Sequence, residues 1–166
     1  LGEMFTVSGQ VALGERPAVR QRYRLIELQR FAEMRGRKLN PKPKFFPVNP
    51  TLADHTIIAI LQSGRDPMVY MDSVFSAVWA EEKDISDEPT LASLLAAAGF
   101  DAAAILARAK EPETAAIRAR NTQDAVDVDA TGVPSFVLNG EPFWGQDRID
   151  LLDRALSSGR APFKAL

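Results

Sequence analysis

The chain has 166 residues, 46% of them hydrophobic, which is enough for one compact domain with a real core. Its net charge of −2 supplies no broad positive field for nucleic acid or anionic lipid, and the absence of cysteine excludes a disulfide framework, a thiolate metal site and a Cys-x-x-Cys redox pair within it. No apolar run approaches the roughly 20 residues needed to cross a bilayer, so we expect a soluble, cytoplasmic protein.

The sequence opens at Leu1 rather than Met, with neither a basic leader nor an apolar signal core, and we expect that a preceding segment has been lost. Pro17 suits a first helical turn, and apolar residues at helical spacing from Val19 onward predict a helix that ends at Gly36. Four prolines within residues 40–50 prevent a regular helix and predict a stiff, extended loop that can line a site.

The middle of the chain is predicted to be helical throughout. Asp and Pro residues mark helix starts, and Gly residues mark helix ends. In one of these segments Met71, Val74, Phe75 and Val78 share an apolar face. The predicted helices open at Thr51, Asp66, Asp87, Asp101 and Pro112, and the last of them runs to about Val128.

The last forty residues are predicted to form a β-hairpin followed by a helix. Ser135 to Leu138 form a strand-like run, Asn139-Gly140 is the best short-range signal for a hairpin turn, and residues 142–144 can return antiparallel. The apolar spacing after Arg148 predicts an amphipathic terminal helix. Because an isolated hairpin is only marginally stable, we expect it to pair with further strands that precede Leu1.

Gly132-Val133-Pro134 comes just before the predicted strand and has two readings. Proline is the residue that accepts a cis peptide bond in a tight turn. A cis Val133-Pro134 bond would turn the N–H and carbonyl of Val133 outward, where they can pair with an extended peptide ligand as an added strand. The alternative is an ordinary turn before an edge strand.

Trp144-Gly145-Gln146-Asp147 follows the hairpin. A helix that opens at Gln146 or Asp147 would present unpaired N–H groups and a positive dipole end to a carboxylate. Asp147 is able to accept from a ligand ammonium, so this corner suits a free α-amino acid group. The alternative is that Asp147 is simply the helix N-cap. Trp144 is the aromatic residue that we expect to contact a ligand rather than fill the core.

Together these features resemble a thioredoxin-like family of isomerases that use glutathione, the 2-hydroxychromene-2-carboxylate isomerases, which are related to the kappa-class glutathione transferases. The resemblance runs over essentially all 166 residues. The matching segments are Gly132 to Phe136, Asn139-Gly140, Phe143 to Arg148, Phe46 to Asn49, and Trp79 with Asp84 to Asp87.

The resemblance implies an α/β fold: a thioredoxin-like domain with an all-helical insertion, whose N-terminal βαβ unit is missing from this chain. Residues 1–14 would be a remnant of the N-terminal half of that domain, residues 15–128 the helical insertion, and residues 129–166 the C-terminal half. In the family the missing unit carries the catalytic Ser, upstream of Leu1, so the catalytic residue stays unknown. Relatives are often dimers, and a homodimer is the default expectation.

For function, the resemblance implies glutathione-dependent cis/trans isomerisation of a small aromatic-degradation intermediate: the glutathione thiolate adds to an activated double bond, rotation follows, and the thiolate leaves. Glutathione transferase activity, a disulfide oxidoreductase relative and a non-catalytic peptide-binding module remain alternatives. Asn49 is implied to face the aromatic substrate, or else it caps the helix after Pro50. The implied glutathione-binding residues are Val133, Pro134, Trp144, Gly145, Gln146 and Asp147.

One departure from the family concerns the substrate carboxylate. Where relatives commonly place a Lys after the opening Leu-Gly, this chain has Phe5-Thr6. Arg16 is a candidate replacement, and a solvated Arg16 is the alternative. His55 is the only histidine, and without a second imidazole or a thiolate it predicts no metal site. We expect neither nucleic acid nor a membrane as a partner.

Overall fold

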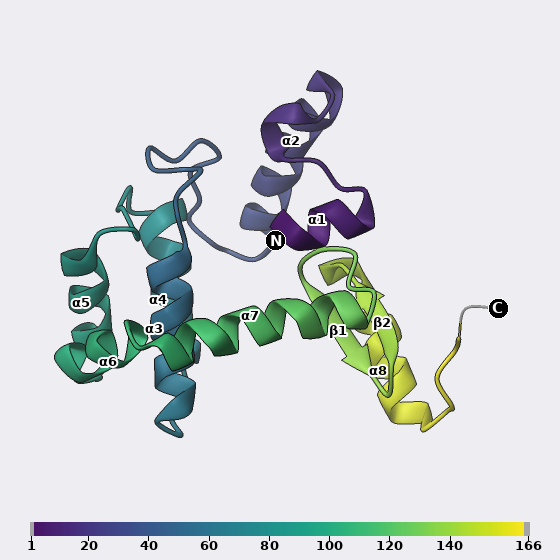
Figure 1. Ribbon diagram of the computed structural model, residues 1–166. Helices are drawn as coiled ribbons and strands as arrows, with labels where there is room; N and C mark the ends of the chain where they lie inside the picture. The colour runs from purple at the N-terminus through teal and green to yellow at the C-terminus, as the bar shows by residue number, and fades with distance from the viewer. Residues whose placement is uncertain (1, 165–166) are drawn as a thin grey trace. The chain divides into compact units, whose positions relative to one another are not determined.

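The computed structural model describes residues 2–164. Its elements follow the predicted order of helices, then a hairpin, then a helix (Figure 1). In chain order they are α1 (Gly2–Ser8), the 3-10 turn η1 (Leu13–Glu15), α2 (Ala18–Met34), α3 (Thr51–Gln62), α4 (Met68–Trp79), α5 (Glu88–Ala97), α6 (Ala102–Ala109), α7 (Pro112–Asp127), β1 (Ser135–Leu138), β2 (Glu141–Trp144), the 3-10 turn η2 (Gln146–Arg148) and α8 (Ile149–Ser158).

The chain divides into two compact units. We call Pro17–Arg118 the helical unit, and we call the described residues of Leu1–Arg16 and Ala119–Leu166 together the hairpin unit. The finer division predicted from the sequence, into residues 1–14, 15–128 and 129–166, stays a prediction.

Helices α5 and α6 begin directly after the predicted Asp87 and Asp101, which serve as their N-caps, whereas α4 begins at Met68, two residues after the predicted Asp66. The carboxylate of Asp87 accepts the N–H of Thr90 at 3.0 Å, and that of Asp101 accepts the N–H of Ala104 at 3.0 Å. Each bond satisfies one of the N–H groups that a helix leaves unpaired in its first turn. As predicted, residues 40–50 contain no helix or strand.

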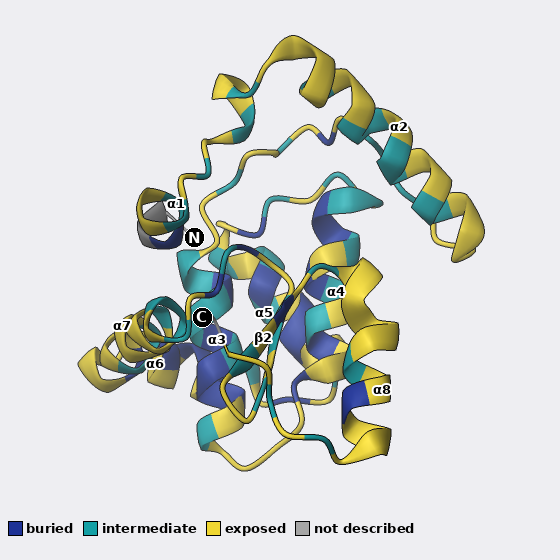
Figure 2. Ribbon diagram, turned by 90° about the vertical axis from the view of Figure 1, so that its right-hand side faces the viewer, coloured by how far each residue is buried: buried dark blue, intermediate teal, exposed yellow. Residues whose placement is uncertain are grey.

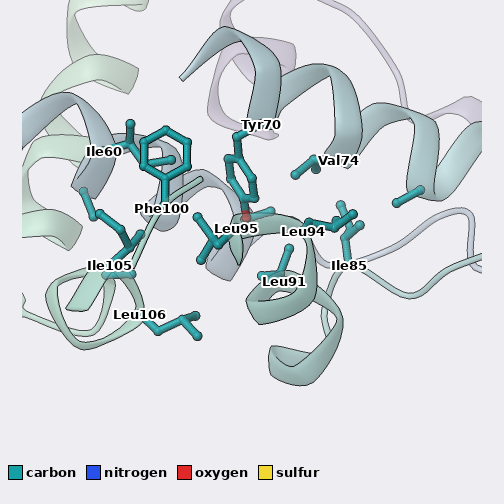
Figure 3. Close-up of a cluster of buried hydrophobic side chains, with 14 of the residues drawn as sticks. Ile60, Tyr70, Val74, Ile85, Leu91, Leu94, Leu95, Phe100, Ile105 and Leu106 are labelled. Atoms are coloured by element: carbon teal, nitrogen blue, oxygen red, sulfur yellow. The ribbon is translucent and has the colours of Figure 1, made fainter. Parts of the chain in front are cut away.

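The core of the helical unit lies among α3, α4, α5 and α6, where α3 and α5 each contact both α4 and α6. Its largest fully buried apolar side chains are Tyr70, Ile60, Leu91 and Leu95. Figure 3 shows the ring of Tyr70 among these side chains. The ring of Phe100 meets it edge-on at a centroid distance of 6.4 Å, the geometry that aromatic quadrupoles favour.

The buried face of α4 differs in part from the face predicted. Val74 and Val78 are buried as the spacing suggests, but Tyr70 and Ala77 complete the buried stripe, while Phe75 is 59% exposed. Position 75 lies about 100° around the helix from position 74, so the packing of α4 on α3 and α5 leaves it outside the stripe.

The helix predicted after Pro17 forms as α2, but its apolar stripe contains no buried residue, and Figure 2 shows α2 without a buried segment. None of the helices within residues 2–164 is both long and apolar enough to span a membrane.

The hairpin unit contains the antiparallel pair β1 and β2, which is the sheet found in the described residues. Leu138 pairs with Glu141, so the turn has two residues, as predicted. Asn139 and Gly140 have φ of 52° and 84°, values that Asn and Gly adopt readily and that match the strand twist. Helix α8 packs against β2, and its buried residue is Ala155; Figure 2 shows the rest of α8 largely exposed.

Candidate functional site

The hairpin register brings the two predicted halves of the site together. Ser135, the first residue of β1, pairs with Trp144, the last residue of β2. The residues just before β1 therefore lie beside those just after β2. The N–H of Gly145 donates to the carbonyl of Pro134 at 2.9 Å and extends this connection past the strands.

Val133 is an exposed residue just before the hairpin. The Val133-Pro134 bond is cis, and Val133 is 64% exposed. Within the described part of the chain, neither the N–H nor the carbonyl of Val133 forms a hydrogen bond with another backbone group. The preceding carbonyl, that of Gly132, accepts the hydroxyl of Ser135 at 2.6 Å. The backbone of Val133 thus offers one donor and one acceptor to an extended ligand.

Gly145 turns the chain away from β2 with φ 105° and ψ 150°. Residues with a Cβ rarely adopt this conformation. A Cβ at Gly145 would also overlap Oδ1 of Asp147. The bare Cα therefore permits both the turn and the close approach of the Asp147 carboxylate.

The helix start differs from the prediction. α8 begins at Ile149 without a side-chain cap, and the 3-10 turn η2 precedes it, so Asp147 is not the N-cap of this helix and the helix does not open at Gln146. Oδ2 of Asp147 instead lies 2.5 Å from Nη1 of Arg148. Both side chains are solvent-exposed, at 66% and 49% respectively. The corner therefore carries an exposed charge pair rather than a capped helix end.

A pocket of about 620 Å³ lies at this corner. Ligand pockets in proteins typically have about 300–1,000 Å³. All six residues predicted to bind glutathione line it, and the sequence reasoning missed Arg148 as a site residue although it belongs to the matching motif. The lining residues are Val133, Pro134, Trp144, Gly145, Gln146, Asp147 and Arg148.

The C-terminal segment is tied to the other end of the hairpin. Arg160 forms a bidentate pair with Glu141, with Nη1···Oε2 and Nη2···Oε1 distances of 2.7 and 2.8 Å, and the N–H of Phe163 donates to the same carboxylate at 3.0 Å. The hydrogen-bonded guanidinium of Arg160 holds the pKa of Glu141 below its ordinary value of 4.5. This long-range pair was not predicted from the sequence.

Asn49 belongs to the helical unit. Its Oδ1 accepts the N–H of Thr51 at 3.0 Å, a local turn contact at the start of α3. Its predicted role toward the substrate stays a prediction. His55 also lies in the helical unit, where Nδ1 is 3.1 Å from the carbonyl oxygen of Ala109. Nowhere in residues 2–164 do three or more His, Asp or Glu side chains gather as metal ligands would.

Comparisons with known proteins agree on the fold. A model of DSBA-like thioredoxin domains matches residues 2–157. The 2-hydroxychromene-2-carboxylate isomerase of Pseudomonas putida is 29% identical over 138 residues, which cover 81% of this chain and 64% of that protein. A solved structure of selenomethionine 2-hydroxychromene-2-carboxylate isomerase superposes with a TM-score of 0.73 at 24% identity, covering 95% of this chain and 76% of the other. The chain thus spans about 64% of the length of its curated relative.

Proposed function

This chain belongs to the DSBA-like thioredoxin domain family, and we propose that it binds glutathione for a cis/trans isomerisation of the type that the related 2-hydroxychromene-2-carboxylate isomerase is named for. The distant relationship to that enzyme supports an isomerase. The observation that carries the proposal is the pocket itself, because the unpaired backbone of Val133 and the charged corner at Asp147 line the same cavity.

The pocket offers complementary groups to an extended tripeptide. The N–H and carbonyl of Val133 pair with the cysteinyl residue of glutathione in the manner of an added strand. The indole of Trp144, 47% exposed, forms a wall beside it. In an antiparallel pairing two opposed residues exchange both hydrogen bonds, so the cysteinyl residue would lie directly opposite Val133.

The charged corner suits the γ-glutamyl end of glutathione, which carries a free ammonium and a free carboxylate on one carbon. The carboxylate of Asp147 accepts from the ammonium, and the guanidinium of Arg148 donates to the carboxylate. The 2.5 Å pair between these two side chains holds the two charges side by side. Gln146 also lines the pocket, and its side-chain amide would supply further hydrogen bonds.

Glutathione would supply the thiolate that adds to a conjugated double bond and leaves after rotation. Residues 1–166 contain no cysteine, so they do not supply a thiol themselves. Their role in this proposal is to bind and orient the tripeptide. No residue of this chain matches the Ser that the family resemblance implies, and the substrate is proposed only as a small aromatic compound facing Asn49.

Isothermal titration calorimetry with glutathione and with the dipeptide Cys-Gly tests the proposal. Glutathione should bind more tightly than Cys-Gly, because only glutathione has the γ-glutamyl charges. Asp147→Asn should reduce this preference and leave Cys-Gly binding unchanged, whereas Glu141→Gln, which alters a residue outside the pocket, should keep the preference. No detectable glutathione binding at millimolar concentration would refute the proposal.

A peptide-binding module is the second candidate. The backbone of Val133 favours it, since an N–H and a carbonyl that pair with no other backbone group can bind any extended peptide. The same titration separates the two: an unrelated tripeptide without a γ-glutamyl group that binds as tightly as glutathione would favour the module.

A further inference from the structure

Gly132 and Trp144 approach each other unusually closely. A Cβ built on Gly132 would lie 2.8 Å from Nε1, 3.3 Å from Cε2 and 3.5 Å from Cζ2 of Trp144. Non-bonded carbon atoms reach their optimal separation at about 3.5–4.0 Å. The indole therefore occupies space that is open only because residue 132 has no side chain.

The indole is not held by burial in a core. Along β2 successive side chains alternate between faces, with Phe143 only 6% exposed and Trp144 47% exposed. The backbone around the indole is fixed by the pairing of Ser135 with Trp144 and by the bond from the Ser135 hydroxyl to the Gly132 carbonyl. One edge of the ring thus lies against a fixed segment, and the rest remains available to the pocket.

We propose that Gly132 is a positioning residue for the pocket: its bare Cα sets the rotamer of Trp144 and thereby the position of the pocket wall. The ligand named here, glutathione, rests on the proposed function. Any side chain at 132 displaces the indole, because the Ser135 hydroxyl bond and the strand pairing keep the backbone from moving away. The width of the pocket beside Val133 is then set by residue 132, which does not itself line the cavity.

Gly132 allows a clean test. Its φ lies outside the left-handed region, so Gly132→Ala introduces the contact with Trp144 without backbone strain. Gly14 provides the matched control, since its φ is also ordinary and nothing lies within 4 Å of a Cβ built on it. Gly14→Ala therefore makes the same chemical change in the same unit without the contact.

The direct readout is fluorine NMR of the chain labelled with 5-fluorotryptophan. The two tryptophans give two signals, which Trp144→Phe assigns. Gly132→Ala should shift the Trp144 signal and leave the Trp79 signal in place, whereas Gly14→Ala should shift neither. An unchanged Trp144 signal in folded Gly132→Ala would overturn the inference, whether or not glutathione binds. A shift of the Trp79 signal in Gly132→Ala would also count against the inference, since the substitution would then disturb the structure beyond the pocket.

Calorimetry with glutathione supplies the second readout. Gly132→Ala should weaken binding about three- to tenfold, the effect of holding a side chain away from its preferred rotamer. In the Trp144→Ala background the same substitution should have no effect, because the ring that it would strike is gone. An equal loss in both backgrounds would overturn the inference. If wild-type protein binds no glutathione, the proposed function fails, and the NMR comparison still decides the role of Gly132.

Discussion

Two buried hydroxyl groups, one on α3 and one on α4, lie within hydrogen-bond distance of each other. Removing one of them should lower the free energy of unfolding more than removing the other. Tyr70 and Thr56 are both 0% exposed, and their oxygens lie 2.9 Å apart. The Thr56 hydroxyl already donates to the carbonyl of Ala53 at 2.8 Å, so its single proton is in use. Tyr70 must therefore be the donor and Thr56 the acceptor.

The two partners should then differ in what their removal costs. Tyr70→Phe removes a donor and leaves the Thr56 proton satisfied, so it should lower the free energy of unfolding by about 1 kcal/mol. Thr56→Val leaves the Tyr70 hydroxyl buried without its acceptor and also removes the bond to Ala53. It should cost about 2–3 kcal/mol, since a stranded buried polar group loses its full hydration. In the double variant no Tyr hydroxyl is stranded, so its cost should fall below the sum of the two.

Urea denaturation of the wild type, both single variants and the double variant, followed by circular dichroism, gives the four free energies. A larger loss from Tyr70→Phe than from Thr56→Val would contradict the assigned donor. Strict additivity in the double variant would show that the two hydroxyls do not interact, and the reasoning would be wrong.

Three further predictions concern single residues. Gly145→Ala should lower the free energy of unfolding by about 1–3 kcal/mol, measured by urea denaturation, because φ at this residue is +105°. It should also weaken glutathione binding, measured by calorimetry, because the added Cβ displaces the Asp147 carboxylate. Unchanged binding would exclude a role of Gly145 in placing that carboxylate. Because Arg160 lowers the pKa of Glu141, the stabilisation from their pair is present above pH 4.5 and is lost as the pH falls below it. Melting temperatures of wild type and Glu141→Gln should therefore converge as the pH falls below 4.5, and a constant gap would argue against the pair. Burial raises the pKa of Tyr70 above its ordinary value of 10.0, so stability should decline as the pH rises past 10, and Tyr70→Phe should lack this part of the decline in alkaline melting curves.

The sequence was most informative where local chemistry decides the structure. Proline, Asp and Gly residues marked the helix boundaries of the helical unit, and Asn139-Gly140 gave the hairpin and its turn length. These signals act over a few residues, so tertiary contacts rarely override them. The resemblance to 2-hydroxychromene-2-carboxylate isomerases is confirmed by the family match and by the relative from Pseudomonas putida.

The structural features that were not predicted do not follow from local residue patterns. Helix α1 has only seven residues, with Thr6 and Val7 disfavouring a helix, so local propensity gave no signal. Asp147 is a typical capping residue, but the conformation of Gly145 places a 3-10 turn before α8. The close approach of Trp144 to Gly132 follows from strand register and rotamer together, which no spacing in the sequence reveals.

The two units differ in how their chain segments come together. The helical unit is one continuous stretch, whereas the hairpin unit joins two segments separated by that entire stretch. Joining the ends of about 100 flexible residues costs on the order of 4 kcal/mol of chain entropy. Because contacts between sequence neighbours form faster than distant ones, we expect the helical unit to fold first during refolding. The joining of the two segments of the hairpin unit would then be completed late, whereas the pocket, which residues 133–148 line by themselves, does not depend on that long closure.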